Sequence, residues 1–332
     1  MEPTSPVQPT APEKPVARPP IVDTIPDHRI VPLNGYFERN RFHPLLTALL
    51  LVILSFVVFQ GVAAVVMAVL VSVGMIREGR TDLQPDELMA ELLGGNPEAV
   101  LIGNTVGQFV GMGFLVWGWT RLHSKPAREF VRVRRADVLQ TVYSVIGLLL
   151  LMPVVQWLGP INEALPLPEG WKAFEAQQVQ LVESIVTNAD LSLALALFAL
   201  AVTPGLCEEL MFRGYLQRQV ERVGGPVWAM VSVGIFFGLY HLRLTQAIPL
   251  SLIGVYLGFV LWRTGSLWPA IIVHFLNNAL LLVLVRVAMA RGVDLETVES
   301  TPIPWYLAFL CALGVAGIVV LMNRRADRLL SP

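Results

Sequence analysis

Long runs of apolar residues alternate with short polar segments over most of the chain. A membrane-spanning helix needs roughly 20 mostly apolar residues, and on that criterion the pattern predicts eight spans. They are residues 45–76, 98–120, 136–159, 190–212, 227–242, 246–263, 268–290 and 304–322. We therefore expect an all-α fold, a polytopic membrane helical bundle of about eight transmembrane helices packed within the lipid bilayer.

The polar segments divide the chain further. Residues 1–43 are rich in proline and poor in large apolar side chains, so we predict a disordered cytoplasmic tail that cannot bury enough surface to fold. Residues 44–189 contain the N-terminal spans, residues 190–290 contain the spans with polar interruptions, and residues 291–332 contain the last span and a basic cytoplasmic tail.

One segment between the third and fourth predicted spans has a helical apolar pattern of its own. The apolar positions recur at helical spacing at Trp171, Phe174, Leu181, Val182 and Ile185. This pattern predicts an amphipathic helix that either lies on the outer membrane surface or packs on the bundle as a lid.

Composition agrees with a membrane protein and excludes other classes. Of the 332 residues 55% are hydrophobic and only 15% are charged, and the mean hydropathy is +0.62. A soluble fold of this size could not bury so much apolar surface. The net charge of −1 provides no excess of cations to neutralise phosphates, so no nucleic-acid partner is expected. Cys207 and Cys311 both lie in apolar runs, where a buried thiol is inert.

Loop charges predict the orientation. If the N-terminus is cytoplasmic, the predicted inner segments hold 18 of the 24 Lys and Arg residues. Because cytoplasmic loops carry an excess of Lys and Arg, we expect a multi-pass protein of the cell membrane (plasma or inner membrane) with both termini in the cytoplasm. The oligomeric state is left open.

Ionisable residues inside spans are costly and are usually functional or paired. Glu209 and Arg213 are four residues apart, so they share a helix face and are expected to form an ion pair. Glu208 has Phe212 at the same spacing and no partner on its own helix. An unpaired carboxylate at this depth suits a general base or a metal ligand. The alternative to a catalytic or ligand role is that both glutamates only form salt bridges with other helices.

Three further polar residues fall on the following spans. His241 follows Phe237 by one turn, and His274 and Asn278 share one face of the seventh span. Gly224-Gly225-Pro226 is a strong helix break, and Glu208 and His241 each lie about 16 residues from it. An antiparallel hairpin about this break would place them level, so we expect Glu208, His241, His274 and Asn278 to meet in one cavity open to the cytoplasm.

The order of these motifs resembles the CAAX-protease and bacteriocin-processing family of intramembrane proteases, which includes the type II CAAX prenyl endopeptidase. The motifs stand here as Glu208-Glu209-Leu-Met-Phe-Arg213, Phe237-Gly-Leu-Tyr-His241 and His274-Phe-Leu-Asn-Asn278. The resemblance covers about residues 190–290, and it implies an endopeptidase acting on a peptide or membrane-protein substrate. It also implies catalytic roles for Glu208, His241, His274 and Asn278, with Glu209, Arg213 and Phe237 in support.

Two versions of the mechanism are open from the sequence. In the first, Glu208, His241 and His274 bind Zn²⁺ or another divalent metal and leave a position for water. In the second, Glu208 and His241 polarise water without a metal, while His274 and Asn278 stabilise the oxyanion. A non-catalytic membrane scaffold or bacteriocin-immunity protein of the same fold is the main alternative function, and a proton-coupled transporter is a weaker one.

Overall fold

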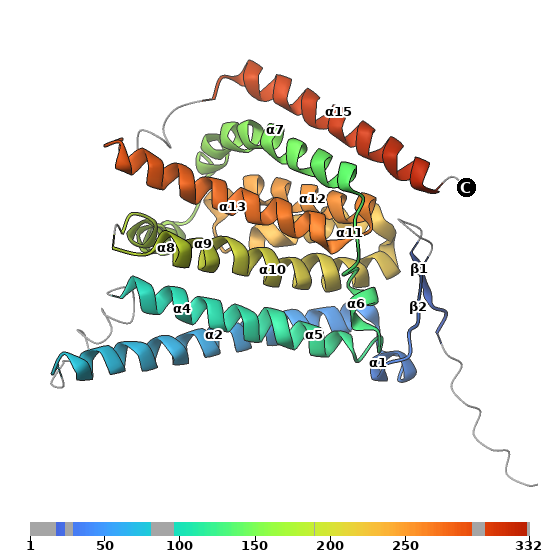
Figure 1. The fold of residues 1–332 in the computed structure, drawn as a ribbon, viewed down its shortest axis with the longest axis horizontal. Coiled ribbons are helices and arrows are strands. Elements are labelled where there is room, and N and C mark those ends of the chain that lie inside the picture. Colours follow the sequence, from blue (N-terminus) through green and yellow to red (C-terminus); the bar gives the residue numbers. More distant parts are fainter. Residues whose placement is uncertain (1–17, 24–28, 81–95, 189, 294–302, 331–332) are drawn as a thin grey trace, which may run out of the picture.

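A computed structural model describes residues 18–23, 29–80, 96–188, 190–293 and 303–330 of the chain. Within these ranges the protein consists almost entirely of helices that run side by side (Figure 1), which confirms the predicted all-α bundle. The long helices other than those within Leu193–Tyr240 are α2 (Pro44–Arg77), α4 (Pro97–Gln108), α7 (Val138–Glu163), α12 (Ala247–Thr264), α13 (Leu267–Ala290) and α15 (Trp305–Leu330).

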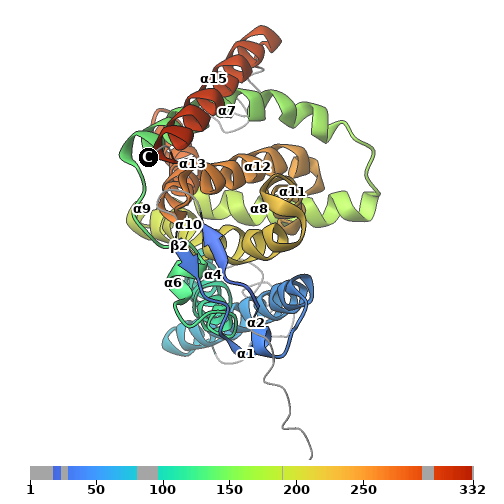
Figure 2. The ribbon, with the colours of Figure 1, turned by 90° about the vertical axis from the view of Figure 1, so that its right-hand side faces the viewer.

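Shorter elements connect or extend these helices. They are strands β1 (Ile21–Asp23) and β2 (Arg29–Val31) and helices α1 (Tyr36–Arg39), α5 (Leu115–Thr120), α6 (Ala127–Phe130), α8 (Glu169–Val186) and α9 (Leu193–Leu197). Viewed from the end that carries the strands, α2 with α4 forms one side of the bundle and α7 with α15 the other. Between them lie α10 (Thr203–Glu209), α11 (Gln217–Tyr240), α12 and α13 (Figure 2). The central group holds the predicted site residues.

The described residues contain seven helices that are long and apolar enough to cross a membrane. The number is seven and not eight because the stretch Leu193–Tyr240, of 48 residues, counts as one span, whereas the sequence predicted two spans there. This stretch is broken at Gly225, whose φ of 79° and ψ of 172° are not helical. The fourth and fifth predicted spans are therefore the two arms of this stretch, on either side of the predicted break.

Proline shapes the first arm. It runs through α9, the π-helical turn η3 (Phe198–Val202), α10 (Thr203–Glu209), a second π-helical turn η4 (Leu210–Leu216) and the start of α11 (Gln217–Tyr240). Pro204 lacks an N–H and cannot donate to the carbonyl of Leu200 one turn earlier. The π-helical turn directly precedes this position, and such turns occur frequently at functional sites.

The segment before the first arm forms the amphipathic helix predicted from its apolar pattern. In α8 the side chains of Leu181 and Ile185 pack with Leu101, Ala199 and Leu282 of the bundle. Phe174 and Val182 on the same helix are 41% and 46% exposed, so α8 packs on the bundle as a lid through only part of its apolar side.

The prediction of a disordered tail over residues 1–43 is wrong for its second half. Residues 1–17 and 24–28 lie outside the described residues, but β1 and β2 pair as antiparallel strands with Ile21 opposite Val31. α1 and the start of α2 follow directly. Both the strands and the C-terminal end of α15 lie at the same end of the bundle (Figure 1). The last helix also continues past the predicted span at residue 322, to Leu330.

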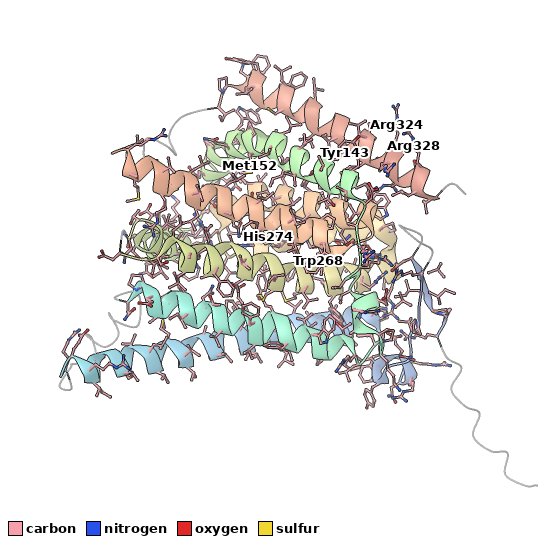
Figure 3. The ribbon with its side chains drawn as sticks, in the orientation of Figure 1. Tyr143, Met152, Trp268, His274, Arg324 and Arg328 are labelled. Carbon is pink, nitrogen blue, oxygen red and sulfur yellow. The ribbon has the colours of Figure 1, made fainter. Side chains whose placement is uncertain are left out.

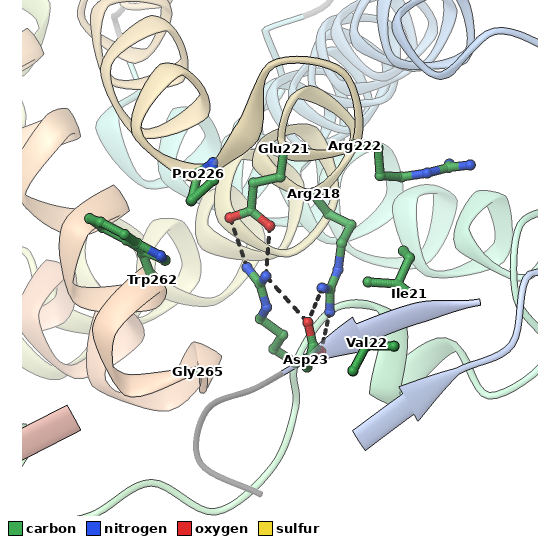
Figure 4. A pocket seen from close by; sticks show the side chains of 10 residues that line it. Ile21, Val22, Asp23, Arg218, Glu221, Arg222, Pro226, Trp262 and Gly265 are labelled. Carbon is green, nitrogen blue, oxygen red and sulfur yellow. Dashed lines mark hydrogen bonds and ion pairs between the residues drawn. The ribbon is translucent and has the colours of Figure 1, made fainter. Parts of the chain in front are cut away.

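Buried charges explain why this segment is ordered. Asp23 accepts hydrogen bonds from Arg218 through both carboxylate oxygens, and Arg134 Nη2 lies 3.1 Å from its Oδ2. Arg132 bridges Asp23 to Glu221, at 3.5 and 2.6 Å (Figure 4). A pocket of about 220 Å³ adjoins this cluster. The carboxylate of Asp23 thus balances the charge of arginines from two distant parts of the chain. Composition alone could not reveal this pairing.

A second carboxylate of the N-terminal segment is anchored in the same way. Glu38 is 3% exposed and accepts hydrogen bonds of 2.9 Å from Nη1 and Nη2 of Arg222. His123 Nδ1 lies 2.6 Å from Glu38 Oε1, and His123 Nε2 lies 2.8 Å from the Tyr215 hydroxyl. The N-terminal segment therefore contacts Arg218 and Arg222, one turn apart on the first arm of the hairpin.

Candidate functional site

Glu208 and His241 meet across the hairpin. In a straight helix residues 33 positions apart would be separated by about 50 Å, whereas Oε2 of Glu208 lies 4.0 Å from Nε2 of His241. The chain must therefore reverse its direction at Gly225, and the two residues lie level as the position of the break predicts. His241 ends the second arm, where it caps α11.

The tautomer of His241 follows from its other ring nitrogen. Nδ1 lies 2.7 Å from the carbonyl oxygen of Phe237, and because a carbonyl only accepts, Nδ1 carries the hydrogen. Nε2 of the neutral ring is then an acceptor that faces the carboxylate. Glu208 Oε2 is buried and has no hydrogen-bond partner among the described residues. Two acceptors thus point to the same small space.

The second glutamate is used differently. Glu209 is fully buried, and its Oε1 accepts from Arg213 Nη1 at 3.0 Å, so the predicted ion pair is present. The same oxygen lies 2.8 Å from Nδ1 of His274. Arg213 also donates from Nη2 to the carbonyl of Gly254 at 3.1 Å. Glu209 thereby connects the first arm to α13 and fixes the orientation of His274.

The aromatic ring of Phe237 joins the two halves of this arrangement. It contacts His241 and His274 edge-on, with ring centroids 4.7 and 5.8 Å away. The guanidinium carbon of Arg213 lies 4.3 Å from the ring centroid. Both histidines therefore lie on the same side of the bundle interior, and His274 is about midway along the stacked helices in Figure 3, where Trp268 lies nearer the end that carries the strands.

Asn278 lies one turn beyond His274 but has a contact of its own. Its Nδ2 donates to the carbonyl of Leu200 at 3.0 Å, the carbonyl that Pro204 leaves without a donor in its helix. Asn277 Nδ2 in turn donates to Asn278 Oδ1 at 3.0 Å. The structure shows no hydrogen bond from Asn278 to the three other predicted catalytic residues, all of which are described.

The predicted metal ligands are not brought together as a set of three. Among the described residues no group of three or more His, Cys, Asp and Glu side chains is close enough to hold a metal ion. Glu208 and His241 offer two donors, and His274, whose Nδ1 bonds to Glu209, has only Nε2 left as a possible ligand and is not close enough to the other two to complete a set of three. This donor set does not fit the zinc site that the sequence suggested, and we derive no step through a metal.

An apolar cavity of about 370 Å³ adjoins the helix that carries the glutamates. It includes Cys207, the neighbour of Glu208, and Ile271, one turn before His274. The other lining residues belong to the η2 (Phe109–Phe114)–α5 region, the segment between α6 and α7, the first arm and the start of α13: Phe109, Gly113, Phe114, Trp117, Val133, Leu206, Leu210, Leu267 and Trp268. All of these are apolar residues or glycine, so the cavity suits a hydrocarbon group. The sequence pattern contained no signal for it.

Comparisons with known proteins point to the same part of the chain. Residues 190–280 match the family model described as type II CAAX prenyl endopeptidase Rce1-like. None of the curated proteins and none of the solved structures compared with the chain matches it. The matched residues include all three motifs, and at the level of the family they imply an intramembrane CAAX-type endopeptidase. The part of the chain that carries the site is therefore similar to the Rce1-like type II CAAX prenyl endopeptidases, as the motifs indicated.

Proposed function

We propose that this protein is an intramembrane endopeptidase in which Glu208 and His241 together activate a water molecule. The observation that carries the proposal is the 4.0 Å separation of Glu208 Oε2 and His241 Nε2. Both atoms are acceptors, so a single water between them donates both of its hydrogens and keeps a lone pair free for attack. A water held this way is oriented before the substrate arrives.

The remaining polar groups supply the other steps. The water oxygen bonds to the carbonyl carbon of the scissile peptide, and one proton passes to Glu208 as the tetrahedral oxyanion forms. His274 acts as the doubly protonated imidazolium, which donates from Nδ1 to Glu209 and from Nε2 to the oxyanion and so stabilises that charge. When the C–N bond breaks, the proton on Glu208 goes to the leaving nitrogen. The products are a carboxylic acid and an amine, and transfer of the acid's remaining water proton to the amine gives a carboxylate and an ammonium, so atoms and charge balance.

The apolar cavity supports a substrate that carries a hydrocarbon group. It borders Cys207 and Ile271, next to Glu208 and within one turn of His274 on their helices, so a lipid chain in it would lie beside a peptide at the site. We therefore propose prenylated peptides with a C-terminal CAAX sequence as the substrate class, in agreement with the description of the matched family.

The test uses purified full-length protein in liposomes with a farnesylated CAAX peptide and the same peptide without the lipid. We expect cleavage of the farnesylated peptide, at least about tenfold slower cleavage of the unmodified one, and loss of both in Glu208→Gln. Equal rates with and without the lipid would refute the substrate class. No cleavage of either peptide, together with full cellular function of Glu208→Gln, would favour a non-catalytic scaffold.

Metal dependence is tested separately. We expect activity to survive dialysis against a chelator, because the described donors provide no set of three ligands for a metal. Loss of activity on chelation with recovery on adding Zn²⁺, and a stoichiometric metal content in the purified protein, would instead establish the metal-assisted version.

A further inference from the structure

Glu175 is a buried carboxylate that none of the steps above uses. It lies on α8, the helix packed on the bundle as a lid, and is only 3% exposed. Its Oε1 accepts from the backbone N–H of Leu244 at 2.6 Å, and its Oε2 accepts from the backbone N–H and the hydroxyl of Thr245 at 3.2 and 2.5 Å. The indole N–H of Trp171, one turn earlier, donates to Oε1 at 2.5 Å. The carboxylate thus binds both residues of one turn.

This turn is separated from His241 by only two residues, Leu242 and Arg243. Leu242 has a φ of 54°, a left-handed conformation that a leucine adopts only when its surroundings impose it. Residues Leu244–Gln246 then form a short 3₁₀ turn that starts α12. Because His241 is the last residue before the left-handed position, any relaxation of the turn also moves the imidazole.

Asn162, near the end of α7, holds the same turn by two further bonds. Its Nδ2 donates to the carbonyl of Leu244 at 2.8 Å, and its Oδ1 accepts from the N–H of Ile248 at 2.7 Å. Bonds from two other elements, α7 and α8, therefore fix the backbone after His241. Each of the two side chains makes two bonds to this backbone, and Glu175 adds the bond from the Thr245 hydroxyl.

We infer that Glu175 is a positioning residue: it ties helix α8 to the turn after His241 and so holds the imidazole at its working distance from Glu208. The inference rests on the proposed function, since it assigns α8 a role in the reaction carried out at that site. A displacement of about 1 Å at such a position is enough to reduce turnover by about 10²-fold.

The experiment compares wild type with Glu175→Ala and Glu175→Gln in the full chain in nanodiscs. The matched control is Glu183→Gln, an exposed carboxylate on the same helix. Three quantities are measured: hydrogen exchange of the Leu244 and Thr245 amides, the ¹⁵N shifts of the His241 ring, and kcat and KM on the farnesylated CAAX peptide. If Glu175→Ala fails to fold, Thr245→Val, which removes only the hydroxyl donor to Glu175, is measured in its place.

We expect the two amides to exchange at least about tenfold faster in Glu175→Ala, with kcat at least about tenfold lower and KM within about threefold of wild type. The His241 ring shifts should show a loss of the single tautomer, and Glu183→Gln should match wild type throughout. Unchanged exchange, or faster exchange with unchanged kcat and ring shifts, would overturn the inference. If wild type itself cleaves no peptide, the proposed function fails, while exchange and ring shifts still decide whether Glu175 positions His241.

Discussion

His274 shares one oxygen of Glu209 with Arg213: Nδ1 of the imidazole lies 2.8 Å, and Nη1 of the guanidinium 3.0 Å, from the same Oε1. The two adjacent glutamates therefore have separate roles. Glu209 is a brace between the first arm of the hairpin and α13, and Glu208, whose Oε2 is unpartnered among the described residues, remains available for chemistry.

Neutralising each glutamate separates these roles. Glu209→Gln leaves Arg213 without its counter-charge, and breaking a buried ion pair costs about 3–5 kcal/mol, so the melting temperature in detergent should fall. Glu208→Gln removes a charge with no ion-pair partner on its own helix, so stability should be kept while turnover falls by at least about 10²-fold. A stable, inactive Glu209→Gln beside an unfolded Glu208→Gln would reverse the assignment.

Asn278 is expected to act partly through Pro204. Asn278→Ala leaves the half-buried Leu200 carbonyl without a donor, at a cost of about 1–3 kcal/mol. In a Pro204→Ala background the helix regains an N–H that can reach this carbonyl, so the cost of Asn278→Ala should shrink by about 1 kcal/mol. Equal costs in both backgrounds, measured by denaturation in detergent, would show that the hydrogen bond to Leu200 contributes nothing.

The buried strand residue Asp23 should contribute far more to stability than Asp327, a carboxylate in an exposed ion pair. Asp23→Asn removes the charge that Arg218, Arg134 and Arg132 share, and we expect a loss of about 3–5 kcal/mol. Asp327→Asn is the control, because that carboxylate pairs with Arg263 at 2.8 Å but is 70% exposed, where an ion pair is worth at most about 1 kcal/mol. Similar effects of the two changes on the melting temperature would contradict the described anchoring of β1.

The Glu38–His123 pair predicts acid sensitivity. Burial acts to raise the pKa of Glu38, but hydrogen bonds from His123 and Arg222 outweigh it and lower the pKa to about 2. Burial also lowers the pKa of His123, against the opposing effect of Glu38. Both folded values lie below the unfolded ones of about 4.3 and 6.5, so the stability they provide is complete above pH 6.5 and is lost as the pH falls.

The measurement for this pair is the midpoint of unfolding in detergent between pH 7 and pH 3. Wild type should lose stability steadily over this range. Glu38→Gln should be less stable at pH 7 and should change less below about pH 4.5, because the titrating carboxylate is gone. The control Glu78→Gln alters an exposed carboxylate (63%) and should follow the wild-type curve; a Glu38→Gln curve parallel to wild type would contradict the lowered pKa.

Much of the site could be predicted because local rules determine it. The spacing of Glu209 and Arg213 fixes their ion pair, and the break at Gly225 fixes the level of Glu208 and His241. The bond between His274 and Glu209 depends on how α13 rotates against the first arm, and no spacing within one helix contains that information. The link from Asn278 to Leu200 could have been suspected, since Pro204 inside a predicted span always leaves a carbonyl without its donor.

The main errors of sequence reasoning lie in the N-terminal segment. A proline-rich composition predicts disorder because it offers little apolar surface, yet Asp23 and Glu38 are ordered by charge. Their partners, Arg132, Arg218 and Arg222, are 90 or more positions away, so only the folded bundle brings them together. The role of Glu175 was missed for the same reason, because its partners follow it by about 70 positions.

The most direct test of the central claim is a double-mutant cycle on kcat with Glu208→Gln and His241→Ala. If both residues hold the same water, removing one already destroys its activation, and the double variant should be within about threefold of the slower single variant. If the two losses instead multiply, so that the double variant is slower than either single one by the full factor of the other, Glu208 and His241 act on different steps and the shared-water account is contradicted.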